Sequence, residues 1–380
     1  MTSVIDEVLT EDRALFRDTV REFAATEIAP RAGQFDEEAR FPAEVVQAMG
    51  PLGLLGIPIP DAYGGAGADL LDYMVAMEEI SAACASTGVT VSVHNSLVCS
   101  PMVRHGTDEQ KRRYLPELAS GRMLGAYALS KAGAGSDAAA LSCKAARDGQ
   151  DWVLHGAKLW ITSGDEADLV IVFARAPEGV TAFIVETDSP GFSVGKVEEK
   201  LGIRSSSTVE LVLDAVRVPA DRVLGAVGKG LTVAFDTLDG GRIGIGAQAL
   251  GIAQASLDAA VKYANEREQF GKPLAKFQAV QFKIAQVAAE LHGARLGIWH
   301  AASLRDQGRP HTLEAAQAKL FASQVANRAA DEAVQIHGGA GYTTEFPVSR
   351  YFRDARITEI YEGTSEIQKL VIARSLLDPR

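Results

Sequence analysis

The sequence predicts a mainly helical protein with a β domain in its middle. Apolar residues recur at helical spacing up to Gly121, and long helical patterns return from Gly228 onward. Between Arg122 and Leu224 the runs are short, rich in Val, Ile, Thr, Trp and Phe, and separated by turn residues. We therefore expect an N-terminal all-helical domain (1–121), a middle antiparallel β-barrel or sandwich domain (122–225) and a C-terminal four-helix bundle domain (226–380).

The N-terminal third contains several helical patterns. The first helix opens at Thr10 and ends at Pro30, because proline removes a backbone donor. Two later segments are apolar nearly all round, which is typical of helices that are buried on most sides. The further helices expected here cover Ala43 to Met49, Asp69 to about Ser86, about Val89 to Arg104, and Asp108 to Leu118.

The middle third contains a hairpin signal. Asp148-Gly149 stands between the apolar runs Leu141–Ala146 and Trp152–His155, and this dipeptide favours a two-residue turn between strands. The other expected strands are Tyr127–Ser130, Leu169–Ala174, Thr181–Val185, Phe192–Val194 and Val209–Val216, and the C-terminal helices are expected at about 229–266, 274–307, 312–337 and 365–377.

Composition narrows the classes of partner. The chain has 380 residues, with 38 basic and 49 acidic side chains, so its net charge is 38 − 49 = −11, which disfavours nucleic acid or an anionic membrane as the main partner. No apolar run is long enough to span a membrane, and the N-terminus has no signal-peptide pattern. Three cysteines without a CxxC pair predict a reducing compartment, and seven scattered histidines predict no metal site. We expect a cytoplasmic protein.

Two segments of the β domain are candidates for binding an anion or a planar cofactor. The loop Gly133-Ala134-Gly135-Ser136-Asp137 follows a strand and can bring backbone amides close to an anion or a planar cofactor, although most such glycine clusters are ordinary turns. It is not a dinucleotide fingerprint, because no βαβ unit surrounds it. Trp160-Ile161-Thr162-Ser163 ends a strand and offers an indole wall with hydroxyls, which suits a flavin, whereas a lone Trp more often packs a core.

Two further segments lie at helix ends. Arg267-Glu268-Gln269-Phe270-Gly271-Lys272 combines a guanidinium with an aromatic ring, and either the helix dipole or a phosphate explains such an arginine. Gln335-Ile336-His337-Gly338-Gly339 is a glycine helix stop that exposes backbone amides, and its histidine alone is more often structural than a base.

The stretch Ile360 to Gln368 places one carboxylate, Glu362, at a glycine turn that leads into a helix. Ser365 and Gln368 fit the capping-box pattern for the start of that helix. An ordinary acidic helix entry explains Glu362 equally well when the turn is considered alone.

Five motifs occur in a fixed order across this helix, strand and helix layout: YALSKAGAGSD, KLWITSG, EREQFGK, QIHGGAGY and IYEGTSEIQ. Together they resemble the acyl-CoA dehydrogenase family of flavoproteins, and the resemblance covers essentially the whole chain. It is greatest to the short-chain and medium-chain members. The resemblance implies the acyl-CoA dehydrogenase fold and FAD-dependent α,β-dehydrogenation of a short- to medium-chain acyl-CoA, straight or branched, to the trans-2-enoyl-CoA, as in fatty acid β-oxidation.

The resemblance also implies site residues. Glu362 matches the catalytic base, which removes the α-proton while the β-hydrogen leaves as hydride to flavin N5. The residues implied for FAD are Tyr127, Leu129, Ser130, Ser136, Trp160, Ile161, Thr162, Arg267, Gln269, Phe270, Gln278, Gln335, Gly338, Gly339, Thr364 and Glu366, those from Arg267 to Gly339 reaching the FAD of a neighbouring subunit. The residues implied for the acyl-CoA are Ser136, Asp239, Arg242, Tyr361, Gly363 and Arg374.

Three departures from the family pattern bear on the expected base, the substrate class and the loop at Lys131. Some relatives carry the base immediately before the arginine that aligns with Arg242, but here that position is Gly241, so Glu362 has no rival. Gly88 stands where glutaryl-CoA members have an arginine, which disfavours a dicarboxylate substrate. Lys131-Ala132 replaces the usual Glu-Pro, and the missing proline loosens the loop.

The resemblance further implies an electron-transfer flavoprotein as the electron acceptor and a homotetramer arranged as a dimer of dimers. The alternatives are a flavin oxidase or monooxygenase on the same fold, a dehydrogenase acting on an acyl-carrier-protein thioester, and a non-catalytic nucleic-acid-associated relative, which the acidic composition disfavours. Acyl selectivity is expected to depend on pocket depth around His94, Asn95, Leu97 and Tyr361.

Overall fold

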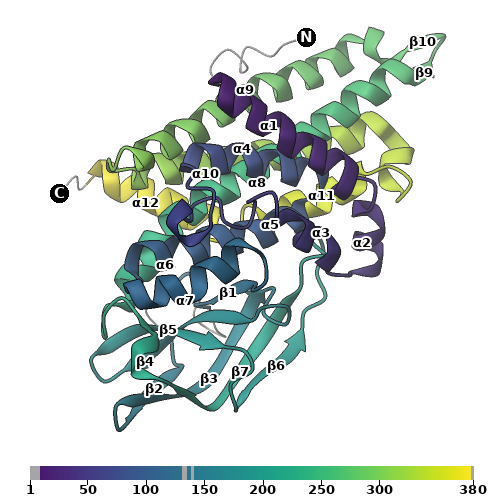
Figure 1. The fold of residues 1–380 in the computed structure, drawn as a ribbon. Helices are drawn as coiled ribbons and strands as arrows, with labels where there is room; N and C mark the ends of the chain where they lie inside the picture. The colour runs from purple at the N-terminus through teal and green to yellow at the C-terminus, as the bar shows by residue number, and fades with distance from the viewer. Residues whose placement is uncertain (1–8, 131–134, 138–140, 378–380) are drawn as a thin grey trace.

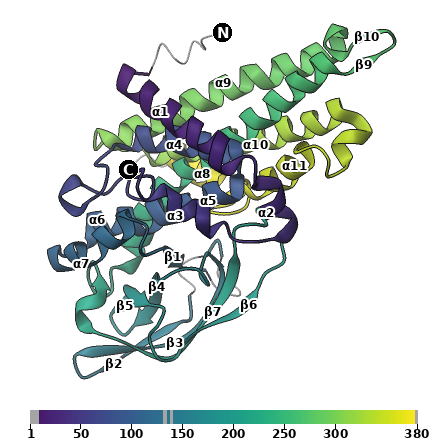
Figure 2. The ribbon, with the colours of Figure 1, turned by 45° about the vertical axis from the view of Figure 1, so that its right-hand side comes forward.

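The computed structural model describes residues 9–130, 135–137 and 141–377. The N-terminal and C-terminal helices lie together in one body, and the strands form a separate part beneath it (Figure 1). The turned view in Figure 2 shows the same separation. Buried residues from both helical parts, such as Met77 and Leu250, belong to one hydrophobic core. The predicted order of helices, strands and helices is confirmed, while the limits of the three domains stay a prediction.

The N-terminal helices differ from the expected pattern at two places. The chain leaves helical geometry at Cys84, where φ is −156°, so the helix expected to continue to about Ser86 ends at Ala83. The segment from Ala85 to His105 is continuously helical, with a π-helical stretch between two α-helices. The elements are α1 (Glu11–Phe23), a π-helical turn (Ala24–Ile28), α2 (Ala32–Glu38), α3 (Ala43–Met49), η3 (Asp61–Tyr63), α4 (Leu70–Ala83), α5 (Ala85–Ser92), η4 (Val93–Cys99), α6 (Ser100–His105) and α7 (Asp108–Ala119).

Local capping explains two of these helix starts. The Asp69 carboxylate accepts a hydrogen bond from the Asp72 N–H (2.9 Å) at the start of α4. Thr107 and Gln110 form a capping box at the start of α7, in which each side chain bonds the backbone N–H of the other residue (3.2 and 3.0 Å).

The strands form one eight-stranded sheet with the order β6-β7-β3-β2-β4-β5-β8, and β1 pairs with β4 in parallel. The expected hairpin at Asp148-Gly149 is present, because β2 and β3 are antiparallel with Asp148 opposite Asp151. Most other pairs are antiparallel, but β2 also runs parallel to β4. The strands are β1 (Gly125–Ala128), β2 (Lys144–Asp148), β3 (Asp151–Thr162), β4 (Leu169–Ala176), β5 (Gly179–Glu186), β6 (Phe192–Val197), β7 (Thr208–Val218) and β8 (Val223–Leu224), with η6 (Ala220–Arg222) before the last strand.

The β3 strand is longer than the expected Trp152–His155 and contains a register shift near its end. The shift against β7 falls between Lys158 and Ile161. Trp160 adopts a left-handed φ of 59°, and its side chain is 56% exposed, whereas Ile161 is buried. A bulge of this kind turns a side chain away from its regular face. The irregularity therefore puts the indole on the outside of the sheet.

Helix α8 (Gly230–Glu266) is the central element of the C-terminal part. Its glycines let other elements approach closely: a Cβ atom on Gly246 would come within 3.0 Å of Ile298, and one on Gly251 would come within 3.0 Å of the Glu78 carbonyl oxygen. The helix α11 was not expected; four of its ten residues are charged, and its buried residues are Val348, Asp354 and Ala355. The other elements are β9 (Glu268–Gln269), β10 (Lys272–Pro273), η7 (Leu274–Lys276), α9 (Gln278–Asp306), α10 (Thr312–His337), η8 (Gly338–Tyr342), α11 (Val348–Ile357) and α12 (Ser365–Leu377).

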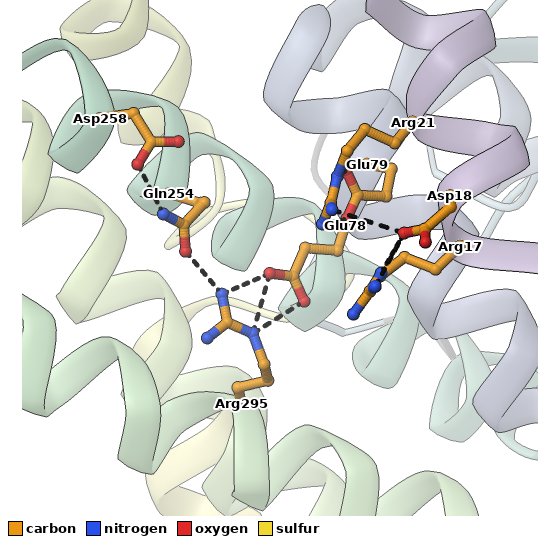
Figure 3. Close-up of polar contacts among 8 residues, drawn as sticks. All are labelled: Arg17, Asp18, Arg21, Glu78, Glu79, Gln254, Asp258 and Arg295. Atoms are coloured by element: carbon orange, nitrogen blue, oxygen red, sulfur yellow. Dashed lines mark hydrogen bonds and ion pairs between the residues drawn. The ribbon is translucent and has the colours of Figure 1, made fainter. Parts of the chain in front are cut away.

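A buried ion pair joins the two helical parts (Figure 3). The Arg295 guanidinium on α9 donates from Nε to both oxygens of the Glu78 carboxylate on α4 (2.9 and 3.1 Å). It also donates to Gln254 Oε1 on α8 (2.8 Å), so three helices meet at one arginine. Next to this contact, Arg21 on α1 bonds Glu79 on α4. The N-terminal helices are therefore tied to α8 and α9 by charge as well as by apolar packing.

No helix within the described ranges is both long and apolar enough to cross a membrane. The cysteines Cys84, Cys99 and Cys143 are all buried and carry free thiols.

Candidate active site

The turn that carries Glu362 connects α11 to α12. Glu362 has a left-handed φ of 48°, and Gly363 follows with a φ of 95°. A left-handed conformation costs a residue other than glycine about 1 kcal/mol, so surrounding contacts must hold Glu362 in it. This geometry points the carboxylate away from the helix that follows and toward α8.

The helix after the turn is capped differently from the expected capping box. Thr364 is the N-cap residue, and its hydroxyl accepts a long hydrogen bond from the Ile367 N–H (3.4 Å). Ser365 is the first helical residue, and its hydroxyl oxygen has no partner. The Gln368 amide donates to the Gly363 carbonyl oxygen (2.8 Å), and the Ser365 N–H, which a capping box would pair with Gln368 Oε1, donates to the Glu359 carbonyl oxygen (2.9 Å). The predicted Ser365–Gln368 capping box was therefore wrong, because the Gln368 side chain bonds the Gly363 carbonyl group of the turn.

The Glu362 carboxylate lies against Gly241 of α8. A Cβ atom at position 241 would come within 3.0 Å of Glu362 Oε2, and Leu97 lies beside the same point. Although the residue as a whole is partly exposed, its Oε2 atom is buried and has no hydrogen-bond partner within the described chain. Burial raises the pKa of Glu362 to about 7, and the nearby cations Lys319 and Arg242 oppose this rise. A carboxylate with a pKa near neutrality is suited to general base catalysis.

Tyrosines surround this carboxylate. The hydroxyl of Tyr127 on β1 is buried without a partner, and burial together with the Glu362 charge raises its pKa. The Tyr361 hydroxyl donates to Gln248 Oε1, and the Gln248 amide donates to the Ala85 carbonyl oxygen (2.8 Å). Burial also raises the pKa of Tyr73 on α4. These phenols are neutral at physiological pH and form an uncharged wall.

The space next to Glu362 is small on the α4 side. A Cβ atom on Gly244 would lie 3.1 Å from Ser92 Oγ and 3.6 Å from the Tyr73 hydroxyl oxygen. The Ser92 hydroxyl is buried and has no partner within the described residues.

His94 and Asn95 have structural roles. The Gly125 N–H donates to His94 Nδ1 (3.2 Å), and His94 Nε2 lies 3.1 Å from the Leu118 carbonyl oxygen. Burial lowers the pKa of His94 to about 4. Asn95 bonds the backbone of Leu54 and Ile57. Of the four residues expected to set the depth of an acyl pocket, only Leu97 and Tyr361 lie near Glu362.

The expected acyl-CoA residues divide into two groups. Arg242 is buried, forms an ion pair with Asp239, and has an Nε atom without a partner within the described residues. Asp239 also accepts a hydrogen bond from Thr312 (2.8 Å). Tyr361 and Gly363 flank Glu362, whereas Arg374 and Ser136 are exposed.

The residues expected at the flavin ring gather at the ends of β1 and β3. The Leu159 N–H donates to the Ser130 carbonyl oxygen (3.1 Å), and Lys158 Nζ donates to the Leu129 carbonyl oxygen (3.0 Å). Lys131-Ala132 and Gly133-Ala134 lie outside the described residues. The exposed Trp160 and a buried Ser163 hydroxyl without a partner fit a flat aromatic group with polar edges. Trp160, Thr162, Leu129 and Ser130 are at least partly exposed, and Ile161 is buried.

The other expected FAD residues lie at the end of the helical body that carries β9 and β10. We call this end the tip (Figure 1). Phe270 is 93% exposed with a left-handed φ of 53°. Cβ atoms on Gly338 and Gly339 would meet no atom within 4 Å, so the backbone there is open to an approaching group. Arg267, Gln269, Gln278 and Gln335 are exposed at the same end. Within one chain this group is remote from Trp160, while Thr364 and Glu366 stay beside the Glu362 turn.

Sequence reasoning missed Lys319 on α10. Its side chain is fully buried, and Nζ donates to the carbonyl oxygens of Tyr361 (3.1 Å) and Gly363 (2.7 Å). A signal was present: Lys319 falls at the spacing of Ala315, Ala322 and Ala326, which are core positions of a helical pattern. A lysine at such a position requires a buried partner. No group of residues suited to binding a metal occurs within the described ranges.

The fold consists of helices, a β-sheet and further helices. It holds the Glu362 carboxylate, the exposed Trp160 ring and the exposed β9–β10 tip on separate elements. Three family models match the chain in the same order: the N-terminal domain of acyl-CoA dehydrogenase over residues 10–122, the middle domain over 126–216, and the C-terminal domain over 228–377. The chain belongs to the acyl-CoA dehydrogenase family.

Curated relatives agree with this membership. The mitochondrial short-chain specific acyl-CoA dehydrogenase of Rattus norvegicus is 51% identical over 374 residues, covering 97% of this chain and 91% of the relative. The short-chain specific acyl-CoA dehydrogenase of Clostridium acetobutylicum is 49% identical over 370 residues, covering 96% and 98%.

Solved structures show the same fold. Butyryl-CoA dehydrogenase of Megasphaera elsdenii has a TM-score of 0.95 at 43% identity and covers 97% of this chain and 99% of its own. A chain in a structure of the electron transferring flavoprotein of Acidaminococcus fermentans has a TM-score of 0.96 at 44% identity, covering 97% and 99%. An acyl-CoA dehydrogenase of Bacillus anthracis complexed with FAD has a TM-score of 0.93 at 34% identity, covering 98% and 67%.

Proposed function

We propose that this protein catalyses the α,β-dehydrogenation of short- to medium-chain acyl-CoA thioesters to trans-2-enoyl-CoA, with FAD as cofactor and Glu362 as the base. The observation that carries the proposal is the buried, unpartnered Glu362 Oε2 atom at the left-handed turn against Gly241. The relatives named as short-chain specific support the short end of the substrate range. The FAD-bound neighbour and the exposed Trp160 face support the cofactor.

The residues of this chain supply the acid–base part of the reaction. Glu362 takes the α-proton of the thioester on its carboxylate, and its raised pKa makes it a stronger base than an exposed glutamate. The Glu362 N–H forms no hydrogen bond with the rest of the described chain, so it is free to donate to a thioester carbonyl oxygen. Bound FAD supplies the acceptor for the β-hydrogen as hydride.

Residues that surround Glu362 provide the remaining functions. Leu97 and the neutral phenols of Tyr127 and Tyr361 exclude water from the carboxylate, which keeps the proton transfer within the site. The cation Arg242 lowers the energy of negative charge near Glu362.

The test is anaerobic mixing of the flavin-loaded protein with saturated acyl-CoAs, including butyryl-CoA, hexanoyl-CoA and isobutyryl-CoA. We expect the flavin absorbance to bleach with at least one of them, most rapidly with the short straight chains. If no saturated acyl-CoA bleaches the flavin, the proposed activity is wrong. Rapid reoxidation of the reduced protein by air would instead indicate an oxidase, and slow reoxidation supports a dehydrogenase.

The role of Glu362 has its own test. Glu362→Gln should retain FAD and bind acyl-CoA but lose flavin reduction by about 10²- to 10⁴-fold, which is the usual contribution of a general base. Reduction at the wild-type rate would mean that the base is another residue.

The proposed assembly is a homotetramer arranged as a dimer of dimers, in which the tip residues Arg267, Gln269, Phe270, Gln278, Gln335, Gly338 and Gly339 contact the FAD of a neighbouring subunit. The exposed Phe270 and the 90% exposed Tyr342 support this proposal, because aromatic side chains are enriched at protein–protein interfaces. Sedimentation at equilibrium would test it, and a monomer with bound FAD would contradict it.

The proposed electron acceptor is an electron-transfer flavoprotein, supported by the structural neighbour from Acidaminococcus fermentans. Reduced protein should be reoxidised by such a flavoprotein faster than by air. A cytoplasmic location stays a prediction.

A further inference from the structure

Lys319 is a charged residue on a face of α10 that otherwise consists of small apolar residues. Its neighbours along the α10 face, Ala315, Ala316, Ala322 and Ala326, are fully buried, and so is Lys319 itself. Burying an ammonium group is costly unless strong acceptors receive its hydrogen bonds. A lysine at this position therefore has a specific set of acceptors.

Those acceptors are the two carbonyl groups on either side of Glu362. Lys319 Nζ donates to the Tyr361 carbonyl oxygen at 3.1 Å and to the Gly363 carbonyl oxygen at 2.7 Å. No hydrogen bond runs from Nζ to the Glu362 carboxylate within the described residues. The ammonium group therefore holds the peptide unit before Glu362 and the peptide unit after Gly363, and so restrains the turn that sets the direction of the Glu362 Cα–Cβ bond.

A second contact holds the same turn from α12. The fully buried Gln368 donates from Nε2 to the Gly363 carbonyl oxygen (2.8 Å), which thus receives two hydrogen bonds. The left-handed φ of 48° at Glu362 needs such support, because isolated chains avoid it.

The charge of Lys319 also acts on the carboxylate. The charged or titratable groups that face Glu362 are Lys319 from α10, Arg242 from α8, Tyr127 from β1, Tyr73 from α4 and its neighbour Tyr361. Glu359, Glu366 and Arg242 act on Lys319 in turn. Only Lys319 and Arg242 lower the pKa of Glu362 against the effect of burial.

We propose that Lys319 is the positioning residue of the turn that carries Glu362: by bonding the carbonyl groups of the residues on either side of Glu362, its ammonium group holds the carboxylate against Gly241. This inference rests on the proposed role of Glu362 as the base. Lys319 acts through Glu362 and contacts neither the substrate nor the cofactor.

The test compares three variants of the FAD-loaded protein. Lys319→Met removes both the hydrogen bonds and the charge, and Lys319→Gln keeps an NH₂ donor without the charge. Gln368→Leu removes the second hydrogen bond to Gly363 and leaves the charge in place. Lys283→Met is the matched control, because Lys283 pairs with Glu332 on the α9–α10 surface away from the turn. The rate of flavin reduction by butyryl-CoA is measured in single turnovers from pH 6 to pH 9.

We expect Lys319→Met to reduce flavin about 100-fold more slowly, with little change in the acyl-CoA concentration at half-saturation, since a displacement of about 1 Å at a reacting group has this effect. The pH at which the rate reaches half its maximum should rise, because the loss of a nearby cation raises the pKa of the carboxyl. Lys319→Gln should recover part of the rate but keep the raised midpoint. Gln368→Leu should slow reduction without raising the midpoint, and Lys283→Met should match the wild type.

The outcomes separate this inference from the proposed function. If the wild type bleaches with butyryl-CoA and Lys319→Met and Lys319→Gln match its rate and pH midpoint, the inference about Lys319 is overturned and the function stands. If the wild type does not bleach, the function itself fails. If Lys319→Met does not fold, the other two variants test the inference. It is overturned if Lys319→Gln keeps the wild-type pH midpoint and Gln368→Leu keeps the wild-type rate of flavin reduction.

Discussion

Gly241 on α8 and Glu362 on the turn before α12 meet so closely that a Cβ atom on the glycine would come within 3.0 Å of Glu362 Oε2. The two residues are far apart in sequence and occupy one point in space. The position that carries the base in some members of the family pattern and the position proposed for the base here therefore lie side by side in space.

Substitution of Gly241 tests this relationship. We expect Gly241→Ala to fold, because the group it meets is the end of a flexible side chain, and to slow flavin reduction about 100-fold by displacing the carboxylate. The double variant Gly241→Glu with Glu362→Gly should regain part of the rate lost in Glu362→Gly alone. Single-turnover reduction by butyryl-CoA measures both effects, and a fully active Gly241→Ala would show that Glu362 acts from another orientation.

The stability of the protein should depend on the ionisation of Glu362. Its pKa is about 7 in the folded protein against an ordinary value of 4.5, so the folded state binds the proton more tightly and stability falls as pH rises from about 4.5 to about 7. Glu362→Gln removes this loss and should be more stable than the wild type at pH 8 by at most about 3 kcal/mol, with the difference vanishing near pH 4.5.

The measurement is the thermal midpoint of the flavin-loaded protein without acyl-CoA, at one protein concentration, at pH 5 and pH 8. Glu345→Gln serves as the control, because Glu345 is exposed. An equal difference between Glu362→Gln and the wild type at both pH values would contradict the raised pKa.

Arg295 should be a large contributor to stability because its removal leaves Glu78 charged and buried (Figure 3). We expect Arg295→Met to destabilise the protein by about 3–5 kcal/mol, and the added change Glu78→Gln to recover part of this loss. Arg122→Met provides the comparison, since the Arg122–Glu117 pair is exposed and should contribute less than about 1 kcal/mol. Unfolding midpoints in urea would rank the three variants, and equal midpoints would refute the expectation.

Phe270 should affect cofactor retention although it stands between β9 and β10, which Figure 1 shows away from the strand β3 that contains Trp160. If the tip completes a neighbouring subunit's site, Phe270→Ala should release FAD on gel filtration and shift the protein toward smaller assemblies. Leu15→Ala removes an exposed apolar side chain from α1 and should leave both properties unchanged. Full FAD occupancy in a Phe270→Ala protein of wild-type size would exclude this role.

Much of the fold follows from local chemistry in the sequence. The spacing of apolar residues predicts the long helices, and the Asp148-Gly149 turn predicts the β2–β3 hairpin, because both depend on neighbouring residues. Local patterns gave the wrong result at two places, where a residue outside the pattern made the competing contact. The Ser365–Gln368 capping box did not form because Gln368 bonds the Gly363 carbonyl oxygen. The helix expected to run to about Ser86 ends at Ala83, and Gly88 of the next helix packs against Ser81.

The sequence by itself determined which chemistry is present: one glutamate in a glycine turn, an indole at a strand end, and glycine-rich helix stops, arranged in a family order. Only the tertiary structure decided how these groups are held. It places Gly241 against Glu362, turns Trp160 outward through a bulge, and brings Lys319 to the two carbonyl groups of the active-site turn. The physical reason is that side-chain type and spacing are local properties, whereas burial, and the pKa and orientation that follow from it, arise when helices distant in sequence pack together.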